Sequence, residues 1–146
     1  MVPRIARRGD AALTKAQNPG TKAGLKKILV IDDDPVMRAL LTEALSHGYS
    51  VTTAADGREG VDTLKRDKHD LVVLDLLMPR MHGFEVCRHI REDPVLKGTK
   101  IIVSSSKAYD HDIKTAKTAG ADWYLVKPYT MKDMLAKIAE LLEEPA

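Results

Sequence analysis

Three aspartates and one lysine in this sequence come at the ends of apolar runs of β-forming residues. Asp32 and Asp33 follow one run, Asp75 follows a second, and Lys127 ends a third. Because the carboxyl ends of parallel strands meet at one edge of a sheet, where the ligands of open α/β folds bind, we expect these side chains to share a site. A carboxylate that stands beside a metal ion, an amine and a hydroxyl group is equipped to accept a phosphoryl group. We therefore predict that Asp75 is a nucleophile.

Clustered carboxylates repel one another, by about 3 kcal/mol per pair at a separation of about 5 Å and an effective dielectric constant of about 20. A hard divalent cation removes this penalty, and oxygen ligands from acids, water and phosphate suit Mg²⁺. Lys127 and a serine from the segment Ser104-Ser105-Ser106 would supply the positive charge and the hydroxyl donor that phosphoryl oxygens bind.

The elements that must position these residues alternate regularly along the chain. Strands are expected over 27–31, 49–54, 71–75, 100–105 and 122–127. Helices are expected from Pro35 to Gly48, over 56–68, around Phe84, Cys87 and Ile90, over 110–118 and over 131–144. Five strands that alternate with five helices predict an α/β fold with a doubly wound parallel sheet.

Some burial patterns are also predicted. The first helix should bury one stripe, formed by Met37, Leu40, Leu41, Ala44 and Leu45. The five histidines lack recognised metal-ligand spacing, so all five are expected at the surface. Trp123 is expected to be exposed or to face a partner.

Composition limits the class of protein. The chain has 146 residues, 44% of them hydrophobic, which suits one soluble domain. No apolar run is long enough to span a membrane, and the single cysteine, Cys87, fits a reducing cytoplasm. Residues 1–27 carry seven basic residues against one acidic residue, whereas the remainder has a net charge of −4. Because the folded part is acidic, direct binding of nucleic acid is not expected.

Residues 1–24 lack sustained periodicity and contain Asn18-Pro19-Gly20. The favoured interpretation is a basic, disordered leader or a misplaced start, followed by one domain over 25–146. An electrostatic arm for an acidic partner and an Arg-rich transit peptide are weaker alternatives. No second hydrophobic unit follows the last expected helix, so a stand-alone domain is expected.

Four motifs in the chain resemble those of the receiver domain of response regulators, which act in two-component signalling and phosphorelays. The motifs are Val30-Ile31-Asp32-Asp33-Asp34, Leu74-Asp75-Leu76-Leu77-Met78-Pro79 with Gly83, the lone position Ser105, and Tyr124-Leu125-Val126-Lys127-Pro128. They span residues 26 to 144, and their order and spacing are specific. The resemblance implies a flavodoxin-like fold with strand order 2-1-3-4-5.

The resemblance also implies a role for each metal-site residue. Asp75 would be the phosphoacceptor. Mg²⁺, or Mn²⁺ as a substitute, would be held by Asp33 directly, by Asp32 mostly through water, and by the backbone carbonyl of Leu77.

Three further residues would bind the phosphoryl group or respond to it. Lys127 would grip the phosphoryl group, Ser105 would be the switch hydroxyl, and Tyr124 would be the switch aromatic. Together they would alter the surface formed by the fourth helix, fifth strand and fifth helix. The resemblance permits a cis Lys127–Pro128 bond without requiring it.

The leading hypothesis is a single-domain response regulator that takes phosphate from a sensor histidine kinase or a histidine phosphotransfer protein and acts on an unidentified protein target. It would catalyse only its own phosphorylation and dephosphorylation, and would be a monomer or a weak homodimer. A degenerate receiver-like interaction module is the alternative, and an aspartate-nucleophile phosphatase of related fold is a weaker one.

Overall fold

The computed structural model describes residues 24–78, 80–106 and 109–143, and its centre is a five-stranded parallel sheet. The strand order is β2-β1-β3-β4-β5, as predicted. The strands are β1 (Lys27–Ile31), β2 (Ser50–Ala54), β3 (Leu71–Asp75), β4 (Lys100–Ser105) and β5 (Trp123–Val126). The helices are α1 (Pro35–Leu45), α2 (Gly57–Arg66), α3 (Gly83–Glu92), α4 (Asp110–Ala119) and α5 (Met131–Leu142). The predicted leader, residues 1–24, lies almost wholly outside the described residues.

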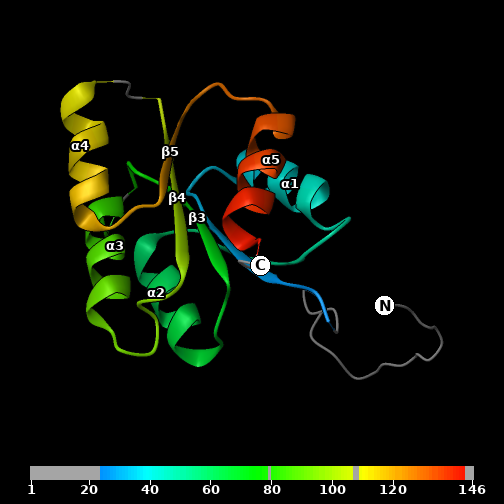
Figure 1. Cartoon of the computed structure of the whole chain (residues 1–146), viewed down its shortest axis with the longest axis horizontal. Coiled ribbons are helices and arrows are strands. Elements are labelled where there is room, and N and C mark those ends of the chain that lie inside the picture. The colour runs from blue at the N-terminus through cyan, green and yellow to red at the C-terminus, as the bar shows by residue number, and fades with distance from the viewer. Residues whose placement is uncertain (1–23, 79, 107–108, 144–146) are drawn as a thin grey trace.

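Two apolar clusters, one on each face of the sheet, hold the layers together. Figure 1 shows α1 and α5 on one side of the sheet and α3 and α4 on the other. Side chains of each strand alternate between the two clusters: in β4, Ile102 belongs to the cluster on the α1/α5 side, whereas Ile101 and Val103 belong to the opposite one. This alternation decides which face each residue at a strand end will occupy.

Polar caps fix where the helices begin. Asp34 accepts a hydrogen bond from the amide of Val36, and Pro35 opens α1. Asp56 caps α2 through Glu59, and Thr130 caps α5 through Asp133. The first of these caps turns the chain into α1 directly after the acidic pair that ends β1.

Two burial predictions are wrong. Leu40 is 51% exposed, because α1 packs on the sheet through Leu41 and Leu45. The helix also ends earlier than predicted, at Leu45 rather than at Gly48. His69 is 1% exposed, because the turn between α2 and β3 encloses it: its Nδ1 lies 2.7 Å from the carbonyl of Asp67, and the charged groups of Lys27 and Asp70 are near it. Burial lowers the pKa of His69.

Two aromatic residues, Trp123 and Tyr124, begin β5 and pair with Ile102 and Val103 of β4. Trp123 is 45% exposed, as predicted, and the ammonium group of Lys137 lies 3.5 Å from the centre of its ring. The next residue, Tyr124, packs against the cluster on the α3/α4 side. Adjacent residues of β5 therefore contact different parts of the molecule.

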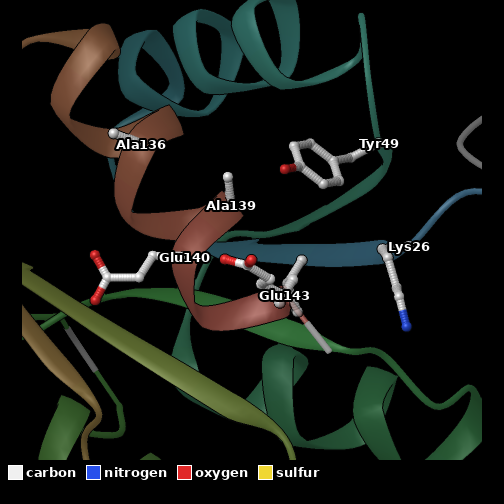
Figure 2. Close-up of a pocket in the computed structure, with 7 residues that line it drawn as sticks. Lys26, Tyr49, Ala136, Ala139, Glu140 and Glu143 are labelled. Atoms are coloured by element: carbon white, nitrogen blue, oxygen red, sulfur yellow. The ribbon is translucent and has the colours of Figure 1, made fainter. Parts of the chain in front are cut away.

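A hollow of about 580 Å³ lies beside the start of β1, between α5 and the turn that precedes β2 (Figure 2). It is lined by Lys26, Tyr49, Ala136, Ala139, Glu140, Leu142 and Glu143. Because these residues lie at the amino end of the sheet, the hollow is separate from the acidic strand ends. None of the described helices is both long and apolar enough to cross a bilayer.

Candidate functional site

The predicted acids converge at the carboxyl end of the sheet. One carboxylate oxygen from each of Asp32, Asp33 and Asp75 lies within 4.8 Å of the others. Asp32 and Asp75 are 2% and 8% exposed, whereas Asp33 is open to solvent. The geometry therefore combines two buried carboxylates with one accessible carboxylate at the mouth.

Lys127 enters the same cluster from the end of β5. Its Nζ lies 3.4 Å from Oδ2 of Asp32 and 3.6 Å from Oδ1 of Asp75. The peptide bond that joins it to Pro128 is cis. Among the residues that the structure describes, one lysine faces three carboxylates here, so the cluster retains an excess of negative charge.

The surroundings of Asp75 favour its protonated form. Burial, followed by the neighbouring charge of Asp32, raises the pKa of Asp75 to about 6, while Lys127 opposes the rise. Hard oxygen ligands in such an environment fit a divalent cation, because the cation supplies the charge that one lysine does not.

The backbone around the acids is held firmly. Oδ1 of Asp32 accepts the amide of Asp34 at 2.9 Å, and the carbonyl of Asp32 accepts Nη1 of Arg38 at 2.8 Å. Gly83 sits against the end of β3: a Cβ there would lie 2.9 Å from Cα of Leu76, too close for any other residue. The start of α3 can therefore pack directly against the backbone at the end of β3. The side chain of Leu77 is 43% exposed.

Ser105 and Tyr124 lie close together on the face of the sheet that α3 and α4 cover. Burial raises the pKa of Tyr124, and a side-chain hydrogen bond with Ser105 partly offsets the rise. The carbonyl of Ser105 accepts the amide of Lys127 at 2.8 Å. The two predicted switch residues are thus in contact, and the backbone links them to the lysine.

Sequence reasoning missed one residue near the acids, Tyr129, and left Ser104 without a role. Tyr129 is partly buried against the cluster on the α1/α5 side. Burial, then the charge of Asp32, raises its pKa to about 12, and Asp75 adds to the rise. The alternation of β4 could have placed Ser104 on the face opposite to Ser105, but no local pattern places Tyr129 beside it.

A family model for the response regulator receiver domain matches residues 28–139. This chain is a receiver domain. Members of the family work in two-component signalling through phosphorylation, and binding of Mg²⁺ follows from membership. Receiver domains typically serve as signalling modules.

Individual relatives agree with this assignment. Response regulator MprA of Mycolicibacterium vanbaalenii is 42% identical over 117 residues, which cover 80% of this chain and 50% of the relative. The chain therefore spans about half the length of the curated relatives it matches. The structure of chemotaxis protein CheY4 of Vibrio cholerae aligns with a TM-score of 0.78 at 31% identity, covering 82% of this receiver domain and 100% of that chain. A CheY-like receiver domain protein of Methanospirillum hungatei aligns with a TM-score of 0.76 at 31% identity, and the alignment covers 80% of this chain and 93% of that chain.

Proposed function

We propose that Asp75 is the phosphoryl acceptor of a receiver domain at residues 25–146, preceded by a basic leader, and that its donor is a histidine of a sensor kinase or of a phosphotransfer protein. The observation that carries this proposal is the convergence of Asp32, Asp33 and Asp75 within 4.8 Å, with Lys127 in contact. One oxygen of Asp75 attacks the phosphorus atom, and the histidine nitrogen leaves with the electron pair of the broken bond.

The neighbours of Asp75 have distinct tasks in this proposal. Asp32, Asp33, Asp75 and the Leu77 carbonyl would hold Mg²⁺ or Mn²⁺, which when bound supplies positive charge for the phosphoryl oxygens. The ammonium group of Lys127, 3.6 Å from Asp75, binds a phosphoryl oxygen and keeps the transferred group in line. The protein would catalyse no reaction besides its own phosphorylation and dephosphorylation.

The response would pass through Ser105 and Tyr124. The Ser105 hydroxyl exchanges its hydrogen bond with Tyr124 for one with the phosphoryl group, and the ring of Tyr124 adjusts. The affected surface is formed by α4, β5 and α5, and it would bind an unidentified protein target in the cytoplasm, as a monomer or a weak homodimer. Stand-alone action is part of this proposal.

Intact-mass measurement after incubation with acetyl phosphate and Mg²⁺ tests the proposal. We expect one phosphoryl group per chain, lost in Asp75→Asn and retained in the control Asp62→Asn, which removes an exposed carboxylate of α2. No adduct on the unmodified chain would favour a degenerate interaction module. Rapid turnover of added phosphoesters would favour a phosphatase.

A further inference from the structure

Ser104 is the direct neighbour of Asp75 across the sheet. The two residues are register partners in the parallel pair β3 and β4, where adjacent strands lie about 5 Å apart. Val73 and Ile102, two positions before each, both belong to the cluster on the α1/α5 side. The side chains of Ser104 and Asp75 therefore lie on the same face, opposite to Ser105.

The hydroxyl of Tyr129 reaches the same place from the segment between β5 and α5. Its pKa responds to the charges of Asp32 and Asp75 and to the nearby hydroxyl of Ser104, so all three lie close to it. Its ring packs against the cluster on the α1/α5 side. Two hydroxyl groups from different segments thus meet beside the carboxylate that we propose as the acceptor.

Both hydroxyl groups are buried, and they lie close enough to interact with each other, but within the described part of the chain neither completes a hydrogen bond of full geometry. Ser104 is 1% exposed. A buried hydroxyl without a partner is unfavourable, and hydrophobic residues of similar size would avoid this penalty. Two such groups beside two carboxylates indicate a role in the chemistry of the site.

We propose that Ser104 and Tyr129 form a hydroxyl pair that donates hydrogen bonds to the buried side of the Asp75 carboxyl group across one water, and thereby speeds loss of its phosphoryl group. The inference rests on the proposed function of Asp75. Both residues act through Asp75 and are positioning residues.

The direction of the effect follows from the charge on Asp75. During hydrolysis, the oxygen of water bonds to phosphorus and the bond between phosphorus and the Asp75 oxygen breaks. The electron pair of that bond returns to Asp75 as a carboxylate, inorganic phosphate leaves, and the water protons pass to phosphate and solvent. Because negative charge grows on Asp75 in the transition state, hydrogen-bond donors there lower the barrier.

The test is the half-life of the phosphorylated protein in Ser104→Ala and Tyr129→Phe, each of which removes one oxygen atom. The protein is loaded with acetyl phosphate and Mg²⁺, the donor is removed, and loss of phosphate is followed by intact mass. We expect each variant to lengthen the half-life about three- to tenfold, the range of one hydrogen bond to a charged group that is partly formed in the transition state. The double variant should lengthen the half-life by a factor smaller than the product of the two single-variant factors, because the hydroxyls act as a pair.

Thr99→Val is the matched control. Thr99 also carries a buried hydroxyl without a partner among the described residues, but it precedes the opposite end of β4. Thr99→Val should leave the half-life unchanged. Ser104→Thr, which keeps a hydroxyl at this position, should lose phosphate at nearly the rate of the unmodified chain.

Three results would overturn the inference. If both single variants lose phosphate at the original rate, or if Thr99→Val lengthens the half-life equally, the pair has no specific role, although Asp75 remains the acceptor. If the unmodified chain takes up no phosphate, the proposed function fails and the inference fails with it.

Discussion

The paired carboxylates at the amino end of the sheet and the acidic cluster at its carboxyl end lie in opposite charge environments. At the amino end, Asp67 pairs with Lys27, and Asp122 pairs with Arg91 at 3.0 Å while also accepting the amide of Ile101 at 2.8 Å. At the carboxyl end Asp56 pairs with Arg80, but within the described part of the chain the three carboxylates of the cluster share one lysine.

The contrast separates charges that stabilise the fold from charges that serve the chemistry. Lys27 lowers the pKa of Asp67, as an opposite charge should, whereas burial and Asp32 raise that of Asp75. The carboxyl end is therefore destabilised until a cation or a phosphoryl group arrives. Substitutions at the two ends should change stability with opposite signs.

The largest effect is expected from Arg91→Ala at the amino end. The guanidinium group donates to the carbonyls of Gly120, Lys97 and Thr99, at 2.9, 2.7 and 2.6 Å, besides its pairing with Asp122. Its removal leaves several part-buried acceptors without a donor and should lower the free energy of unfolding by about 3 kcal/mol.

Urea denaturation measures this loss, and Arg88→Ala on the exposed side of the same helix is the control. Uptake of phosphate from acetyl phosphate should survive in the folded fraction of Arg91→Ala. An equal loss of stability in Arg88→Ala would remove the distinction between the two arginines.

A second effect, of similar size, is expected from pH in metal-free protein. Because the pKa of Asp75 is about 6 in the folded state and 3.8 for an aspartate in an unfolded chain, the folded state holds a proton that the unfolded chain releases between these values. The contribution of Asp75 is therefore full below pH 3.8 and is lost as the pH rises through about 6, a change of about 3 kcal/mol.

The difference in unfolding free energy between the unmodified chain and Asp75→Asn should show this slope. Addition of Mg²⁺ should flatten it, since a cation favours the ionised carboxylate. A flat difference curve from pH 4 to pH 7 in chelator (roughly the window of the shifted pKa) would contradict the raised pKa that burial and Asp32 give Asp75.

The smallest effect is expected from Asp33→Asn, which removes the exposed member of the acidic cluster. In chelator the variant should be more stable by about 1 kcal/mol, because one repulsive charge is gone. In Mg²⁺ the order should reverse, because the unmodified chain gains more from the bound ion. Thermal unfolding with and without Mg²⁺ measures both differences in stability. The control Glu92→Gln, which removes an exposed acid of α3, should show neither the gain in chelator nor the reversal in Mg²⁺.

Much of this architecture could be predicted from the sequence because strand and site signals are local. β1, β3 and β4 have the predicted bounds, since each contains an unbroken apolar run that is followed directly by a polar residue. The same locality explains why Asp32, Asp33 and Lys127 could be assigned to one edge of the sheet from the sequence alone. Their roles in metal and phosphoryl binding stay predictions.

The parts that could not be predicted depend on contacts between distant segments. Leu40 fits the apolar stripe of α1 as well as Leu41 does, and only the angle at which the helix meets the sheet decides between them. His69 lies in a polar turn whose own residues do not predict burial, and its surroundings include Lys27 from the start of β1. The meeting of Ser104 with Tyr129 depends on how β4 and the segment after β5 come together.

The contact between Trp123 and Lys137 has a practical consequence. The chain contains one tryptophan, and a cation lies over its ring one residue away from Tyr124. Any rearrangement of β5 against α5 would shift that ammonium group and change the emission of the indole. The molecule thus carries a built-in optical reporter, readable in a stopped-flow fluorimeter without any added dye.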